Sequence, residues 1–164
     1  MSERLKVNNQ HFEKLLKICL ILGIIVVSGF IIYVILTPEQ GYVTFGILNE
    51  NKEVGNYPTE RAVNETVSFY LTVENNLYRE FNFRFKIKKG NNETFLSSYG
   101  SNGTLYQTIG NFSLKVKEVQ IYGEYNISFS EVGEDQIVIA ELWQIKNEIE
   151  EFYFILYLLL NITS

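Results

Sequence analysis

An uncharged apolar run near the start of the chain constrains its fold more than any other feature. The 19 residues from Ile18 to Leu36 carry no charge, and their only polar groups belong to Cys19, Ser28 and Tyr33. A helix rises about 1.5 Å per residue, so this run nearly crosses the ~30 Å hydrocarbon core of a bilayer. A buried helix of this length in a soluble protein normally keeps a polar face, and this run has none. The sequence therefore predicts a transmembrane helix over residues 18–36.

Two other kinds of apolar N-terminal segment fit these residues less well. A cleaved signal peptide has an apolar region of about 7–15 residues followed by an A-x-A-like site, and neither feature is present. Lipoprotein processing is disfavoured because Lys17 lies just before Cys19. The polar segment Thr37-Pro38-Glu39-Gln40 ends the run abruptly, and proline can end a helix. We therefore expect an uncleaved anchor, followed by a linker over residues 37–41.

The charges on either side of the helix predict its orientation. Residues 1–17 carry four basic and two acidic side chains, a net charge of +2, whereas residues 37–164 carry ten basic and seventeen acidic ones, a net charge of −7. Lys14 and Lys17 lie at the edge of the apolar run. The positive-inside rule therefore places residues 1–17 in the cytoplasm and residues 42–164 outside the cell. The expected location is the cell membrane, with a single pass, and the acidic exterior argues against a nucleic-acid partner.

The N-x-[ST] triplet, which is the acceptor pattern for N-glycosylation, occurs more often than chance allows. The composition of the exterior portion alone predicts about two triplets. Six are present, all of them after the apolar run: Asn64, Asn92, Asn102, Asn111, Asn126 and Asn161. Asn-rich turns create some triplets by accident, but we expect glycosylation at one or more of these sites. Asn64, Asn92 and Asn102 are the best candidates because they lie in predicted turns, whereas Asn126 and Asn161 lie in predicted strands.

After the linker, short apolar runs alternate with turn signals, as is typical of an all-β domain. The clearest run is Phe81–Ile87, in which Phe and Ile alternate with Asn, Arg and Lys. Residues 97–110 are rich in Ser, Gly and Asn and are expected to form a long surface loop. The expected strands are Tyr42–Leu48, Thr66–Glu74, Phe81–Ile87, Thr94–Leu96, Leu114–Val119, Tyr125–Phe129, Gln136–Gln144 and Phe152–Ile162.

Seven or eight such strands predict an immunoglobulin-like antiparallel β-sandwich over residues 42–164. The final run, Phe152–Ile162, has about ten apolar residues, too few for a second transmembrane helix. The usual immunoglobulin disulfide cannot form, because the single Cys lies in the apolar run. The fold is therefore expected to be stabilised by the packing of its aromatic and aliphatic side chains.

Several segments resemble an archaeal family of membrane-anchored domains of unknown function (DUF family 1616). The resemblance covers about residues 42–160. It rests on Asn56-Tyr57-Pro58-Thr59, Glu65-Thr66-Val67, Val73-Glu74-Asn75, Ile127-Ser128-Phe129, Gly133 and Ile137–Trp143. Family members often carry several membrane helices ahead of this domain, and here there is one. The resemblance implies an outward-facing sandwich on a membrane anchor and no established activity.

The exterior portion offers few side chains for catalysis. It contains no His and no Cys, so His-based acid–base chemistry and metal binding by imidazole or thiolate are excluded there. Glu131, Glu134 and Asp135 lie close in sequence, but they lack the alternating spacing of a calcium loop. A hydrolase that uses a pair of carboxylates is the remaining catalytic alternative. We expect no enzyme activity, no metal and no cofactor.

A non-enzymatic cell-envelope protein fits these observations best. We expect its β-sandwich to bind a protein partner, such as a surface-layer component or a subunit of a membrane complex. The expected partner surface lies in the last strand, at Phe152, Phe154 and Tyr157. A glycan-binding module on the same scaffold is the alternative, since aromatic rings in or near loops can stack on sugars. The rings considered for this role are Tyr99, Tyr106, Tyr122 and Tyr125.

Overall fold

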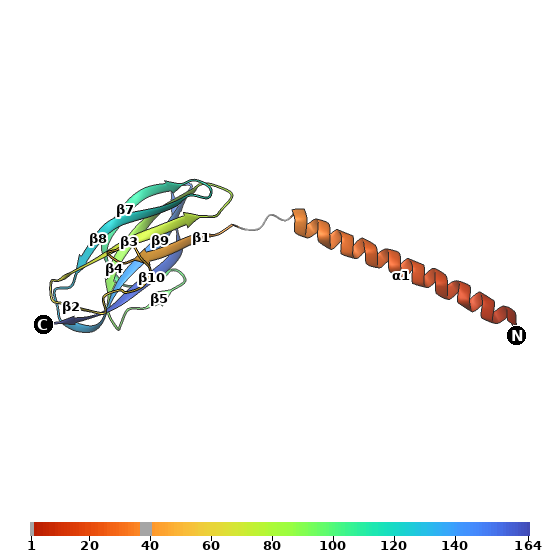
Figure 1. Ribbon diagram of the computed structural model, residues 1–164, viewed down its shortest axis with the longest axis horizontal. Coiled ribbons are helices and arrows are strands. Elements are labelled where there is room, and N and C mark those ends of the chain that lie inside the picture. The colour runs from red at the N-terminus through yellow and green to blue at the C-terminus, as the bar shows by residue number, and fades with distance from the viewer. Residues whose placement is uncertain (1, 37–40) are drawn as a thin grey trace. The chain divides into compact units, whose positions relative to one another are not determined.

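The computed structural model describes residues 2–36 and 41–164 and divides the chain into two units (Figure 1). The first unit is Met1–Gln40 and the second is Gly41–Ser164. The expected linker over residues 37–41 lies, apart from Gly41, outside the described residues.

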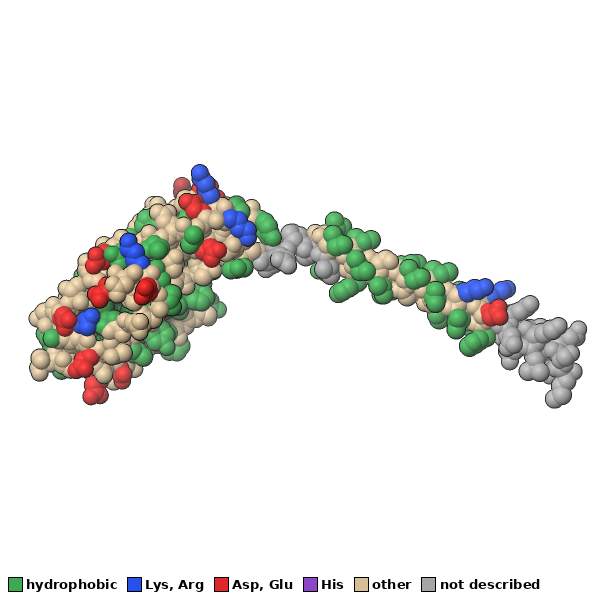
Figure 2. All heavy atoms as spheres, in the orientation of Figure 1, with side chains coloured by type: hydrophobic (Ala, Val, Ile, Leu, Met, Phe, Trp, Pro, Cys, Tyr) green, Lys and Arg blue, Asp and Glu red, His purple; other side chains and the backbone are tan. Residues whose placement is uncertain are grey.

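The first unit is a single helix, α1, which spans Ser2–Leu36. It therefore begins well before the apolar run. Within it, Phe12–Tyr33 is long and apolar enough to cross a membrane by length and composition. All side chains from Phe12 to Tyr33 are exposed, and Figure 2 shows hydrophobic side chains along the helix with its described charges near one end. A helix of this kind fits a single-pass anchor or a signal sequence.

The second unit is a β-sandwich, as the sequence predicts. One sheet has three strands in the order β1-β3-β8, a second has five in the order β2-β10-β9-β4-β7, and β5 and β6 form a small hairpin. Neighbouring strands are antiparallel except for β2 and β10, which are parallel. The strands are β1 (Val43–Leu48), β2 (Glu60–Ala62), β3 (Thr66–Asn75), β4 (Phe81–Gly90), β5 (Leu96–Ser97), β6 (Gly100–Ser101), β7 (Thr104–Leu114), β8 (Val119–Ser128), β9 (Gly133–Lys146) and β10 (Ile149–Thr163).

Aromatic side chains from the two sheets meet in one core. The alternation predicted for β4 is confirmed, because Phe81, Phe83 and Phe85 are fully buried. Across the sandwich, the ring of Phe85 lies 5.8 Å from that of Phe45 on β1 and 5.4 Å from that of Tyr122 on β8. Burying a Phe side chain stabilises a fold by about 1.5–3 kcal/mol. This packing holds the sheets together in a unit that contains no cysteine.

The prediction of a long surface loop over residues 97–110 is wrong. The β5–β6 hairpin occupies its first part, and β7 begins at Thr104. Because β7 lies at the edge of its sheet and pairs only with β4, most of its side chains are exposed. Such a strand has no alternation of buried apolar and exposed polar residues for a sequence pattern to detect.

The prediction of a strand over Leu114–Val119 is also wrong. Leu114 ends β7 and Val119 begins β8, and a turn joins them. The backbone N–H of Lys115 donates to the carboxylate of Glu118 at 2.7 Å, and Lys117 has a positive φ of 62°. The final apolar run is confirmed as a strand, since Phe152–Ile162 lies within β10.

Candidate functional site

β10 has one edge that is only partly covered. On one side it pairs with β9 along nearly its whole length. On the other side β2 covers only Asn161–Thr163. Within residues 2–36 and 41–164, no strand pairs with this second side of Ile149–Leu160. We refer to this side of Ile149–Leu160 as the β10 edge. Unpaired backbone N–H and C=O groups of a strand edge are a template for another strand.

The β10 edge carries exposed apolar side chains. Phe154, Tyr157 and Leu159 are 48%, 49% and 51% exposed, respectively. Phe152 is half-buried, with its ring 5.7 Å from that of Trp143. The three residues expected to form the partner surface therefore all lie on β10, but Phe152 also packs against its own sheet.

An apolar groove of about 500 Å³ lies between β10 and Leu96–Ser98, which contains β5 and is called the β5 segment. None of the residues that line it carries a charge. They are Leu96, Ser97, Ser98, Phe152, Tyr153, Phe154, Ile155 and Tyr157. Tyr153 is the extra residue of a β-bulge, because Phe152 pairs with Trp143 whereas Phe154 pairs with the adjacent Leu142.

A buried carboxylate holds the β5–β6 hairpin over the face of the five-stranded sheet. Glu141 on β9 is fully buried and accepts hydrogen bonds from the backbone N–H of Ser101 at 2.7 Å and from its hydroxyl at 2.8 Å. The Trp143 indole donates at 2.9 Å, and the Lys88 ammonium lies 2.9 Å away. Burial alone would raise the pKa of Glu141, but these donors outweigh it and hold the pKa below its ordinary value.

Sequence reasoning missed Glu141. A signal was available, because a charged residue within the apolar run of β9 must have a partner when the strand is buried. The segment Gln136–Gln144 contains one charge, and it is this glutamate.

A second ion cluster lies near one end of the β10 edge. Glu150 pairs with the guanidinium of Arg84 and, at 2.5 Å, with the ammonium of Lys86. The ammonium of Lys86 also lies 3.9 Å from the centre of the Trp143 ring. The hydrogen bond from Lys86 is the main reason that the pKa of Glu150 is lowered. This glutamate therefore has its charge compensated by its own sheet.

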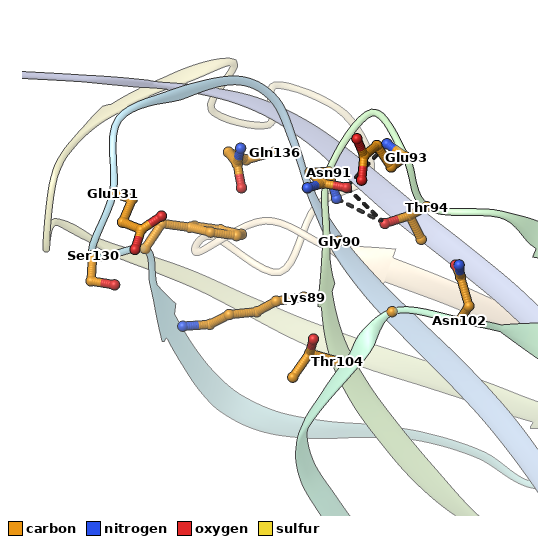
Figure 3. A pocket seen from close by; sticks show the side chains of 12 residues that line it. Lys89, Gly90, Asn91, Glu93, Thr94, Asn102, Thr104, Ser130, Glu131 and Gln136 are labelled. Carbon is orange, nitrogen blue, oxygen red and sulfur yellow. Dashed lines mark hydrogen bonds between the residues drawn. The ribbon is translucent and has the colours of Figure 1, made fainter.

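A separate polar hollow of about 620 Å³ opens elsewhere on the domain (Figure 3). The ammonium of Lys89 donates to the carbonyl of Ser128 and lies 4.7 Å from the ring centre of Tyr106 and 5.2 Å from that of Phe129. Two carboxylates, those of Glu93 and Glu131, also line this hollow. Amide and hydroxyl groups surround the Lys89 side chain, from Asn91, Thr94, Asn102, Thr104, Ser130 and Gln136.

The acidic residues weighed as a calcium site do not gather into a ligand set. Glu131 lines the polar hollow, whereas Glu134 lines a different depression of the surface. Within the described residues, no three His, Cys, Asp or Glu side chains lie close enough to hold a metal ion.

The six candidate glycosylation residues are all exposed. Asn64 and Asn92 lie in turns, and the structure gives no hydrogen bond to the side chain of either within its described residues. The other four side-chain carbonyls accept hydrogen bonds. The donors are the Phe95 backbone to Asn102, Arg84 to Asn111, Ser68 to Asn126 and the Asp135 backbone to Asn161.

Two of the four tyrosines considered for sugar stacking are core residues. Tyr122 is 7% exposed and Tyr125 is half-buried, because β8 extends over both residues and one face of it packs into the sandwich. Burial raises the pKa of each to about 12. Tyr99 and Tyr106 are exposed.

Comparison with solved structures finds likeness in fold. The CARDB domain of a Pyrococcus furiosus protein, crystallised in complex with di-metal ions, is 16% identical, with 78% of this chain and 93% of that one covered and a TM-score of 0.48. The C-terminal domain of Wzt is 11% identical, with 78% and 80% covered and a TM-score of 0.49. No family model matches the chain, and no curated protein matches it.

Proposed function

We propose that this chain is a non-enzymatic, membrane-anchored cell-envelope protein whose β-sandwich binds another protein through the β10 edge. One observation carries the proposal: Ile149–Leu160 has an unpaired side, within the described residues, that borders an uncharged apolar groove. Added strands bind such edges through main-chain hydrogen bonds, and the adjoining pockets select their side chains. Aromatic anchors such as Phe154 and Tyr157 commonly supply the affinity.

The anchor is α1, with residues 1–17 in the cytoplasm and residues 42–164 outside. The charge difference between the two segments, +2 against −7, supports this orientation. Glycosylation of exposed turn residues such as Asn92 is part of the proposal.

The absence of an enzymatic role is part of the proposal, and it fits the environments of the two glutamates whose pKa values are lowered. Glu141 is enclosed and bound to Lys88, and Glu150 is bound to Arg84 and Lys86. A carboxylate that acts as a general acid or nucleophile must reach a substrate from a cleft. Both of these glutamates are instead committed to cations of their own sheet.

Capture from host membranes tests the proposal. Full-length tagged chain, solubilised with detergent, is captured in three forms: wild type, Tyr157→Lys and Leu105→Lys. Leu105 lies on β7, at the opposite edge of the same sheet, and is similarly exposed. We expect a reproducible protein partner with wild type and Leu105→Lys, and its loss with Tyr157→Lys. Recovery by no form of either another protein or a second, differently tagged copy of the chain contradicts the proposal.

Glycan binding is a second candidate function, favoured by the polar hollow. Its amide and hydroxyl groups offer both donors and acceptors, which is what sugar hydroxyls require. A glycan array probed with the full chain tests this, with Gln136→Ala in the hollow and Gln107→Ala on β7 as its control. Selective binding that Gln136→Ala abolishes supports the idea, and uniform signal across the array contradicts it.

A further inference from the structure

We infer that the β10 edge pairs with the β10 edge of a second copy of this chain, antiparallel and about a two-fold axis at Ile155. The inference rests on the proposed function, in that it takes the β10 edge as the docking surface. It goes further by naming the occupant and its register.

The length of the unpaired edge is fixed at both ends. At one end β2 begins to cover β10 at Asn161. At the other end the chain turns sharply through Asn147 and Glu148, which have positive φ angles of 50° and 67°. The span Ile149–Leu160 lies between these limits. A strand that is to fill this edge completely must have the same length, and a second β10 edge has it.

The direction of the backbone groups follows from one hydrogen bond. The N–H of Asn161 donates to the carbonyl of Thr59, so it points away from β9. The pairing of β9 and β10 is irregular between Leu160 and Ile162, but the extra residue there belongs to β9, so the alternation along β10 is unbroken. Backbone groups alternate in direction along a strand, so those of Leu159, Tyr157 and Ile155 point the same way as those of Asn161. The bulge at Tyr153 shifts the alternation by one residue. Before the bulge, the groups of Phe152 and Glu150 therefore point outward.

A two-fold register centred on Ile155 matches every one of these groups. With the bulge counted as one position, Ile155 lies opposite Ile155 of the second copy, Phe152 opposite Tyr157, and Glu150 opposite Leu159. Each outward-pointing residue thus meets another, which is the condition for hydrogen-bonded pairs in an antiparallel ladder. A shift of one residue in either direction would place outward groups opposite inward ones.

The side chains are also compatible with self-pairing. From Phe152 to Leu160 the strand contains no charged residue, so two acidic domains do not bring like charges together along this stretch. Glu150 is already neutralised by Arg84 and Lys86. Tyr157 of the second copy lies beside Phe152, where the groove between the β5 segment and β10 is open to receive its ring.

Disulfide trapping of the full chain in detergent or nanodiscs tests the register. Cys19 is first replaced by Ala, and then Ile155→Cys or the control Leu105→Cys is introduced. Opposed Cα atoms of a hydrogen-bonded antiparallel pair lie about 5.5 Å apart, within the range of a disulfide. We expect Ile155→Cys to give at least tenfold more cross-linked dimer than Leu105→Cys on mild oxidation. Equal cross-linking by the two variants would overturn the inference.

The mass of the particle in solution gives an independent test. Light scattering with detergent correction is expected to show a dimer for wild type and Leu105→Lys, and a monomer for Tyr157→Lys. Circular dichroism checks that the variants keep their β-sheet. Two differently tagged copies are then co-expressed and one of them is captured, which distinguishes self-pairing from the binding of a different protein. If a different protein is recovered and the second tag is not, the self-pairing is wrong while the proposed function stands. If neither is recovered, both are wrong.

Discussion

At the scale of single residues, Glu141 shows how a polar group can organise the outside of a sheet. Its carboxylate collects donors from β4, β6 and β9, through Lys88, Ser101 and Trp143. An ionised group that is removed from water is tolerated only when it is paired and hydrogen-bonded. The hairpin that forms one wall of the groove therefore depends on this one charge.

Replacement of Glu141 by Gln is expected to destabilise the fold by about 3 kcal/mol, since it leaves the Lys88 ammonium nearly buried without a counter-charge. Denaturant unfolding of the full chain, followed through the fluorescence of the single tryptophan, measures the change. Glu151→Gln on the exposed side of β10 is the control, with an expected effect within about 0.5 kcal/mol. Equal effects of the two substitutions would contradict this role for Glu141.

The same carboxylates predict how stability depends on pH. The pKa values of Glu141 and Glu150 are lowered in the folded chain, so the unfolded chain binds their protons more readily. Their stabilising contribution is complete well above the ordinary pKa of 4.5 and is lost as pH falls through the lowered folded values. Unfolding midpoints measured from pH 7 to pH 3 should therefore decline below about pH 5. The double variant Glu141→Gln, Glu150→Gln should show unfolding midpoints that depend less on pH.

Turn geometry and side-chain hydrogen bonds distinguish the glycosylation candidates. Asn64 and Asn92 lie in turns and have no side-chain hydrogen bond within the described residues, whereas Asn126 lies within β8 and is held by Ser68. Mass spectrometry of the chain from a host that has the machinery should find Asn92 and Asn64 more highly occupied than Asn126. Asn92→Gln should lower the mass of the chain by one glycan, whereas Asn126→Gln should leave the mass of the attached glycans almost unchanged. The reverse order would contradict the assignment.

At the scale of elements, strands buried on one face could be predicted from the sequence and exposed edge strands could not. β4 was visible because Phe81, Phe83 and Phe85 alternate with polar residues and enter the core. β7 was not visible, because it is exposed on most of both faces. Phe154 and Tyr157 could be named as a surface from their apolar character alone. The β10 edge could not, because it depends on how few residues of a distant segment, β2, pair with β10.

The β5–β6 hairpin is expected to need glycine at position 100, both for its backbone conformation and for the limited space beside Glu141. This residue has a φ of +114°, and a Cβ added there would lie 3.3 Å from the Glu141 carboxylate. Gly55 has a φ of +95° with open space around it, so Gly55→Ala isolates the backbone effect. Gly100→Ala should destabilise the fold more than Gly55→Ala, by about 1 kcal/mol or more. Denaturant unfolding measures both, and equal losses would show that the contact with Glu141 is unimportant.

At the scale of the whole molecule, the chain joins a helix suited to lipid with a domain whose core is aromatic. The apolar length of α1 and the charge difference across it could be read from the sequence, because both are properties of composition. Retention of the helix in the mature protein is a prediction of its own.

Membrane fractions should retain the full chain after alkaline carbonate extraction, and the intact mass should include residues 1–36. Protease added to whole cells should digest the domain while leaving the N-terminal segment protected. Reversal of the two charges at the membrane edge, Lys14→Glu with Lys17→Glu, should reduce the fraction that faces outward. An N-terminus that begins after the apolar run would show instead that the segment is cleaved.

The sheet order has a consequence for biogenesis. β10 is the last strand of the domain to emerge from the ribosome, yet it lies between β9 and β2 in the five-stranded sheet. Until β10 arrives, β9 exposes an edge that carries the apolar residues Val138, Ala140 and Leu142. The domain therefore cannot complete its fold until β10 has emerged, and nascent chains need protection from one another until Leu158 and Leu160 enter the core.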